Sequence, residues 1–170
     1  MSAIQDSKPI LVVEDLNVHY DTGKGPAKAV NDVSFSLRPG ERLGLIGESG
    51  SGKTTMATAL MRLTRAPGRI AGGSVKLDGR DILKMSNKEL RETRLRDIAL
   101  IPQGAMSSLN PVMRLEEQMI DAIVAHKPGM RRAELDARVQ ELLKNVGLAP
   151  EVARRYPHEL SGGMKQRAAM

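Results

Sequence analysis

The stretch GESGSGKTT at residues 47–55 constrains the fold of this chain more than any other part of it. Its glycines and lysine follow the spacing G-x-x-x-x-G-K-[ST], with Thr54 in the last place. Glycines let the backbone turn its N–H groups toward one anion, and the lysine adds a point charge for the outer phosphates. The threonine hydroxyl suits Mg²⁺, and the N-terminus of a following helix favours negative charge. The sequence therefore predicts a loop that binds nucleotide phosphates.

The segments beside this loop have the character that a phosphate loop requires. Residues 41–47 (ERLGLIG) read as a strand, and residues 54–64 (TTMATALMRLT) read as a helix. A flexible Gly/Ser loop would not need a strand before it and a helix after it. A dinucleotide-binding loop fits worse, because a G-x-G-x-x-G pattern begun at Gly50 would place Thr55 where the last glycine belongs. The predicted nucleotide-binding residues of the loop, of which Thr54 also binds Mg²⁺, are Gly47, Glu48, Ser49, Gly50, Ser51, Gly52, Lys53, Thr54 and Thr55.

The composition argues against several classes of protein. At 170 residues, 41% hydrophobic and 27% charged, the chain is typical of one globular domain. It has no cysteine, which excludes disulfides and thiolate metal sites, and its three histidines are too scattered to form a cluster of metal ligands. The net charge of +6 is compatible with an anionic surface, but basic residues alternate with acidic ones and only three aromatic side chains (Tyr 2, Phe 1) are available for stacking. We therefore expect no nucleic-acid binding.

Strand-like segments dominate the first hundred residues. Turn-forming sequences separate them at residues 21–27, 39–40 and 66–73, and Ser86 with Glu89 predicts a helix that begins with a capping box. The predicted strands are residues 10–20, 29–37, 41–47, 97–101 and a short strand and turn over 74–82.

Helix patterns dominate the remainder of the chain. Apolar residues recur at helical spacing over residues 115–124 and 135–146, and the second pattern ends at Gly147. Apolar residues at this spacing lie on one face of a helix and usually pack into a hydrophobic core. Ser161 is a good N-cap for a last helix, which runs to Met170 without a stop signal and suggests a piece of a longer protein.

A second potential anion site lies at Ser161, Gly162 and Gly163, where two N–H groups and a hydroxyl converge at a helix start. Alone, these residues are weak evidence for an anion site and are more typical of an ordinary helix cap. A phosphate loop, a glutamine (Gln103) after a later strand, a helical insert and then LSGG at residues 160–163 resemble, in that order, the ATP-binding subunits of ABC transporters. In this resemblance Gln103 is the Q-loop residue and LSGG is the signature motif.

The resemblance implies an α/β fold, a P-loop NTPase core with an antiparallel β subdomain and a helical subdomain, incomplete at the C-terminus. It implies a β subdomain and core over residues 9–105, a helical subdomain over 106–160, and the signature with its helix over 161–170. It also implies that Tyr20 stacks on adenine and that Val30 touches the same ring, although a tyrosine at a strand end is often structural.

The segments at 107–111 (SSLNP) and 155–167 look most like the subclass that imports oligopeptides, dipeptides or nickel. Met164 in the fifth signature position fits that subclass, whereas Gly104 and Ala105 replace its usual Asp-Pro and leave the stiffness of the Q-loop open. The family implies ATP and Mg²⁺ as cofactors, with Gln103 beside the metal.

The implied partners are a second ATP-binding subunit in a homo- or heterodimer, transmembrane permease subunits and, indirectly, a solute-binding protein. Residues 161–163 would complete the partner subunit's ATP site in trans. The implied location is peripheral, on the cytoplasmic face of the inner membrane.

The family's catalytic groups have no counterpart in this sequence. The Mg²⁺-binding Asp, the catalytic Glu and the switch His belong after Met170, so Gln103 is the only accessory catalytic residue predicted here. We expect these 170 residues to bind nucleotide weakly and not to hydrolyse it. The run ILVVED at residues 10–15 imitates the missing strand, but it precedes the phosphate loop, and we interpret it as the first strand of the antiparallel subdomain.

Three alternatives remain open. A GTPase would carry N-K-x-D, whereas residues 87–90 read NKEL; a small-molecule kinase is a related possibility. A DNA-repair ATPase would carry a long coiled coil between phosphate loop and signature, where this chain has two ordinary helix patterns. The chain could also be a nucleotide-binding fragment that is not coupled to transport.

Overall fold

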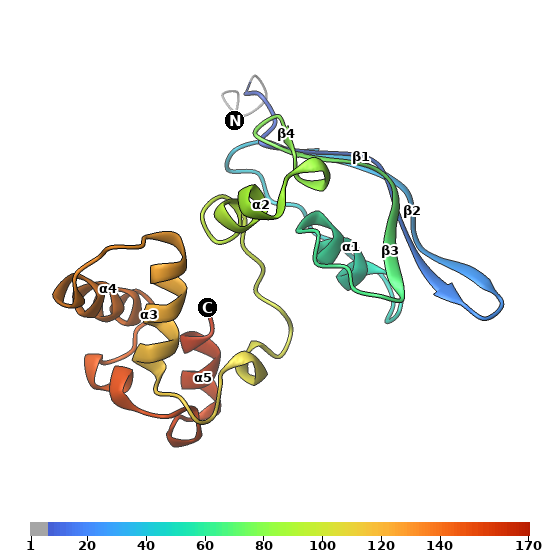
Figure 1. Cartoon of the computed structure of the whole chain (residues 1–170). Helices are drawn as coiled ribbons and strands as arrows, with labels where there is room; N and C mark the ends of the chain where they lie inside the picture. Colours follow the sequence, from blue (N-terminus) through green and yellow to red (C-terminus); the bar gives the residue numbers. More distant parts are fainter. Residues whose placement is uncertain (1–6) are drawn as a thin grey trace. The chain divides into compact units, whose positions relative to one another are not determined.

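Two hydrophobic cores organise the computed structural model of this protein, which describes residues 7–170. The chain divides into the units Met1–Leu100 and Ile101–Met170, and each unit contains one of the cores. The first unit holds the sheet and the helix that follows the phosphate loop, whereas the second is helical (Figure 1).

The first unit is built on a four-stranded antiparallel sheet of order β2-β1-β3-β4. Its first two strands confirm the strands predicted over residues 10–20 and 29–37, and the hairpin turn between them is shorter than predicted. The run ILVVED enters β1, as expected for the antiparallel subdomain. The strands are β1 (Leu11–Thr22), β2 (Gly25–Leu37), β3 (Gly68–Leu77) and β4 (Arg80–Asp81).

Residues 66–73, predicted to be a break in the pattern, lie largely within β3 instead. The pairing of β1 with both neighbours is irregular next to Asp15, whose φ is 46°. Gly73, with φ of 93°, passes so close to Asp15 that an added Cβ would overlap the Asp15 carbonyl. The glycine that suggested a turn is thus the residue that lets a bulged strand pair closely.

Helix α1 (Lys53–Leu60) packs against one face of this sheet (Figure 1). Met56 and Ala59 are buried in the core with strand residues such as Leu16 and Val18. The helix is shorter than the predicted 54–64, because the chain takes a left-handed turn at Arg62, whose φ is 51°.

The C-terminal end of α1 is held by a partly buried guanidinium. Arg94 donates from Nη2 to the carbonyls of Met61 at 2.8 Å and Arg62 at 2.9 Å. Burial, together with the nearby Arg62 charge, lowers the pKa of Arg94. Arg94 follows helix α2 (Asn87–Thr93), which begins with the predicted Ser86–Glu89 capping box, so the end of α1 is tied to α2.

Two predicted strands are wrong. Residues 41–47 have no strand structure, and Leu43 and Ile46 are 52% and 94% exposed. Residues 97–101 contribute only an isolated bridge between Arg94 and Ile98. A strand needs a hydrogen-bonded neighbour, and none of the described strands lies beside residues 41–47.

The second unit confirms both predicted helices of the C-terminal part. Gly147, with φ of 68°, follows the end of the longer one, as predicted. The core consists of residues such as Leu115, Val139, Leu143 and Leu160. The elements are η2 (Ala105–Ser108), α3 (Leu115–His126), α4 (Arg132–Asn145), η3 (Pro150–Arg154), η4 (Pro157–Glu159) and α5 (Gly162–Ala168).

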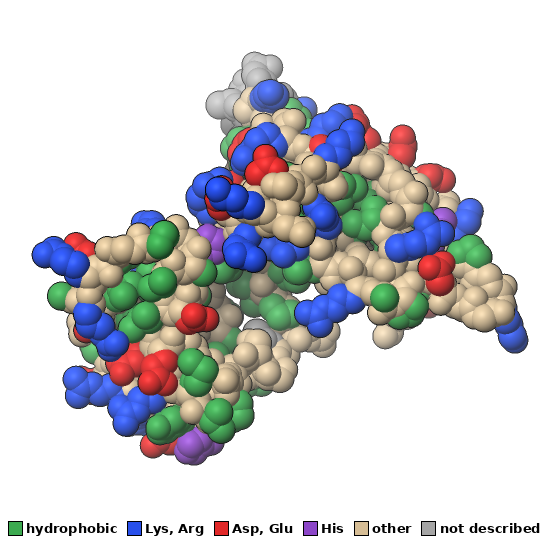
Figure 2. Space-filling view, in the orientation of Figure 1, with side chains coloured by type: hydrophobic (Ala, Val, Ile, Leu, Met, Phe, Trp, Pro, Cys, Tyr) green, Lys and Arg blue, Asp and Glu red, His purple; other side chains and the backbone are tan. Residues whose placement is uncertain are grey.

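The surface carries charges of both signs. On the face shown in Figure 2, basic and acidic side chains are intermixed, with apolar side chains between them. Over the described range 7–170, no helix combines the length and the apolar character needed to cross a bilayer.

Candidate nucleotide-binding site

The phosphate loop is an exposed turn that leads into α1. Gly50 and Gly52 adopt left-handed backbone conformations, with φ of 81° and 89°. The turn closes where the Ser51 N–H donates to the Glu48 carbonyl at 3.2 Å, and Gly52 is the N-cap residue of α1. The loop therefore ends in the unpaired N–H groups of a helix start, where negative charge is favoured.

Lys53 folds back over this loop. Its Nζ donates to the carbonyls of Gly47 at 2.8 Å and Glu48 at 2.5 Å, and to Ser51 Oγ at 3.3 Å. All three acceptors are neutral, and an ionised oxygen is a stronger partner for an ammonium group. The amine is thus held at the loop by contacts that phosphate oxygens could replace.

Strand β2 supports the last glycine of the loop. A Cβ on Gly52 would overlap the carbonyl oxygen of Ala29 and lie 3.8 Å from Val30 Cγ2. The conformation of Gly52 is therefore set both by its φ and by the strand beneath it. The sequence carries no signal for Ala29, because its contribution is a backbone carbonyl.

Tyr20 lies near the end of β1 and contacts the start of α1. Its hydroxyl is 3.4 Å from Thr55 Oγ1, and a Cβ on Gly68 would lie 2.8 Å from its ring. The ring is half-buried, whereas Val30 is only 6% exposed and belongs to the core. The structure brings both residues to the base of the phosphate loop.

Thr54 is exposed in the first turn of α1, next to Lys53. Among residues 7–170, no group of three or more acidic or histidine side chains is placed to hold a metal ion. A single hydroxyl at the phosphate loop fits Mg²⁺ that is held mainly by phosphates and water, which is the usual coordination of this ion.

Gln103 and the serine–glycine segment lie in the second unit. Gln103 is exposed in the turn before η2, and Gly104 beside it has φ of 74°. Ser161 caps α5, as predicted, by accepting from the Met164 N–H at 3.3 Å. Apart from the backbone of the helix itself, nothing lies within 4 Å of a Cβ built on Gly162 or Gly163, so this backbone is open to solvent.

The sequence profile of the ABC transporter family matches residues 30–170. The oligopeptide transport ATP-binding protein OppD of Escherichia coli K12 is 47% identical over 168 residues, which cover 97% of this chain and 49% of that protein. The dipeptide transport ATP-binding protein DppD of Haemophilus influenzae is 41% identical over 160 residues, covering 93% and 48%. The chain thus spans about half the length of the curated relatives it matches.

Among solved structures, the dimeric structure of MJ0796, a bacterial ABC transporter cassette, has a TM-score of 0.81 at 27% identity. The superposition covers 94% of this chain and 66% of the MJ0796 chain. A second structure of that cassette, a dimer in a post-hydrolysis state bound to ADP and Pi, has a TM-score of 0.76 at 24% identity. The α/β P-loop core with antiparallel and helical parts expected from the sequence is therefore the fold of these neighbours.

Proposed function

The chain belongs to the ABC transporter family, and we propose that it is the nucleotide-binding part of an ATP-binding subunit that powers the import of peptides or of a related solute such as nickel. The observation that carries this proposal is the ammonium group of Lys53, held by neutral acceptors at a glycine loop that opens a helix. The resemblance to OppD and DppD supports the choice of solute.

Residues 47–55 bind the phosphates of ATP in this proposal. The N–H groups at the start of α1 and the Lys53 amine attract the phosphate oxygens, and the rigid turn at Gly52 keeps these donors in place. Tyr20 contacts the adenine from the end of β1. Val30 supports the same region from within the core, since its side chain is buried.

In this proposal the Thr54 hydroxyl binds Mg²⁺, and Gln103 keeps the accessory role that the resemblance implies for it. When bound, the ion neutralises phosphate charge. Exposure of the Thr54 hydroxyl and of Gln103 agrees with these roles. The family's metal-binding Asp, catalytic Glu and switch His have no counterpart in residues 1–170, so in this proposal the chain binds nucleotide weakly without turning it over.

Ser161, Gly162 and Gly163 act on the nucleotide of a second ATP-binding subunit. Their exposed backbone allows such an approach without displacing any side chain. The proposed organisation is a β subdomain and core over residues 9–105, a helical subdomain over 106–160 and the signature over 161–170. The assembly includes transmembrane permease subunits and lies on the cytoplasmic face of the membrane.

The proposal is tested by titrating the 170-residue chain with a fluorescent ATP analogue in the presence of Mg²⁺. Replacing Lys53 by alanine removes the charge at the loop, and we expect affinity to fall by about tenfold or more, which corresponds to about 1.4 kcal/mol. Unlabelled ATP should displace the analogue at lower concentration than GTP.

The matched control is Lys88→Ala, which removes an exposed lysine from α2 and should leave binding unchanged. Equal affinity of the Lys53→Ala variant and the original chain would contradict the phosphate-loop assignment. A clear preference for GTP would contradict the proposed ATP-binding subunit and favour a GTP-binding protein.

A further inference from the structure

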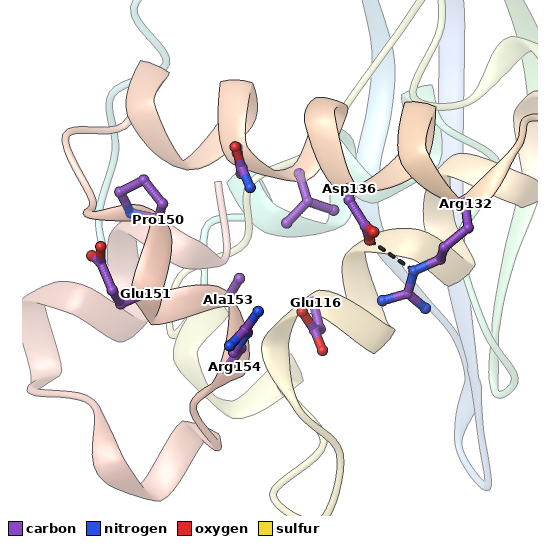
Figure 3. A pocket seen from close by; sticks show the side chains of 9 residues that line it. Glu116, Arg132, Asp136, Pro150, Glu151, Ala153 and Arg154 are labelled. Atoms are coloured by element: carbon purple, nitrogen blue, oxygen red, sulfur yellow. Dashed lines mark hydrogen bonds and ion pairs between the residues drawn. The ribbon is translucent and has the colours of Figure 1, made fainter.

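A cavity of about 510 Å³ lies in the second unit between α3, α4 and η3 (Figure 3). Small-ligand pockets in proteins usually have volumes of about 300–1,000 Å³. None of the residues assigned to nucleotide binding lines it. Its lining consists of Glu116, Arg132, Asp136, Val139, Gln140, Pro150, Glu151, Ala153 and Arg154.

The apolar part of the lining is small and well ordered by packing. Val139 and Ala153 are 2% and 6% exposed and belong to the core of the unit, so they form a fixed floor. Pro150 adds a further apolar surface at one end of the cavity (Figure 3). Because both side chains are almost fully buried, they offer a ligand little surface, and the exposed Pro150 ring is the main apolar contact in the lining.

The charged part of the lining is only partly neutralised within the protein. Arg132 Nε and Asp136 Oδ1 form an ion pair at 2.8 Å, on the side of the cavity away from Pro150 in Figure 3. Glu116, Glu151 and Arg154 form no ion pair with any residue in the range 7–170. Two carboxylates and one guanidinium therefore remain available to a ligand.

The charges select the chemical class of ligand. A simple anion would be repelled by the two carboxylates, and a simple dication would leave the guanidinium unmatched. A ligand with two cationic groups and one carboxylate matches all three side chains. We propose that this cavity binds a basic amino acid or a basic dipeptide, with its α-ammonium group at Glu116, its side-chain ammonium group at Glu151, its carboxylate at Arg154 and its aliphatic chain against Pro150.

This site is independent of the proposed ATP site, and its test does not involve nucleotide. The ¹⁵N-labelled 170-residue chain is titrated with L-lysine at pH 7 and constant ionic strength, and the backbone amide signals are followed by NMR. We expect saturable shifts centred on Val139 and Ala153. Norleucine lacks the second ammonium group and cadaverine lacks the carboxylate, so each should bind about two- to fivefold more weakly, as expected for partly exposed ion pairs.

Two variants assign these preferences to residues. Glu151→Gln should remove the difference between lysine and norleucine, and Arg154→Gln should remove the difference between lysine and cadaverine. Both side chains are exposed, so neither change should disturb the core. The matched control is Arg138→Gln, which breaks an exposed ion pair with Glu141 elsewhere on α4 and should preserve both differences.

The proposal is overturned if lysine causes no saturable shifts at the cavity, or if cadaverine, norleucine or glutamate binds as tightly as lysine. It is also overturned if the two variants keep the selectivity of the original chain.

Discussion

The two glycine motifs of this chain are built in opposite ways. Gly52 has a left-handed φ of 89°, and an added Cβ would overlap the Ala29 carbonyl of β2, so no other residue fits its place without rearrangement. Gly163 lies within α5 and has free space where a side chain would project. The phosphate loop is a conformation fixed by the protein, whereas the signature segment is an accessible stretch of helical backbone.

This difference separates two reasons for a glycine. At Gly52 the residue is needed by the fold of the first unit, because a side chain would collide with strand β2. At Gly163, in the first turn of α5, no described contact requires a glycine, and alanine is the better helix former. A glycine that costs stability and faces open space agrees with the proposed approach of another molecule to this helix.

The largest expected effect is that of Gly52→Ala. Left-handed backbone costs a non-glycine residue about 1–2 kcal/mol, and relieving the overlap with Ala29 adds about 1–3 kcal/mol. The first unit should therefore lose about 2–5 kcal/mol of unfolding free energy. Urea unfolding followed through the amide signals of β2 measures this unit separately from the second.

Gly50→Ala is the matched control for the collision. Gly50 has φ of 81° but no atom within 4 Å of an added Cβ, so only the backbone term of about 1–2 kcal/mol applies. Equal losses in the two variants would show that β2 does not constrain the loop, and the contrast between the two motifs would then rest on φ alone.

Gly163→Ala should have a smaller effect of opposite sign. The substitution places a better helix former in the first turn of α5, and the helix should gain up to about 0.5 kcal/mol, less than at an interior position. Urea unfolding followed through the amide signals of α5 measures the change. A loss of stability in the isolated chain would mean that this glycine serves the fold, and the distinction from Gly52 would fail.

Much of the fold could be predicted from local pattern. The strands β1 and β2, the helices α3 and α4, and the caps at Ser86 and Ser161 follow from alternation, helical spacing and side chains that compete for backbone N–H groups. These signals lie within short segments of sequence, which is why they were sufficient.

The failures concern structure that depends on distant neighbours. Residues 41–47 have the composition of a buried strand, but a strand forms only where another strand supplies its hydrogen bonds. The sequence predicts a turn at Gly73, because its close approach to Asp15 arises only when β1 and β3 are paired. A local sequence pattern indicates only which structure a segment prefers. The structure of these two segments depends on whether a neighbouring strand pairs with them.

The spacing of Gly47, Gly52 and Lys53 predicts a phosphate loop, and the binding role of these residues stays a prediction. The contacts that support this segment could not be predicted. Ala29 constrains the loop through its backbone carbonyl, which every residue type carries. Arg94 binds the end of α1 from about thirty residues further along the chain, so no local sequence pattern marks this contact.

The smallest expected effect concerns the helix starts of the two units. Hydrogen bonds from the side chain and backbone N–H of Ser86 lower the pKa of Glu89, and the backbone N–H and side chain of Arg131 lower that of Glu134. A carboxyl whose pKa is lower in the folded state stabilises the fold above its unfolded pKa, about 4.3 for glutamate, and this contribution is lost as the pH falls through the folded pKa.

Glu89→Gln should therefore reduce the loss of stability of the first unit between pH 7 and pH 3 and leave that of the second unit unchanged, whereas Glu134→Gln should do the reverse. Urea midpoints from the amide signals of β2 and α4 at the two pH values measure both effects. Because both carboxylates are exposed, added salt should reduce the effect of each substitution on the pH dependence of stability. If either variant changed the acid response of both units equally, the units would not unfold independently, and the loop and signature effects would have to be measured as one.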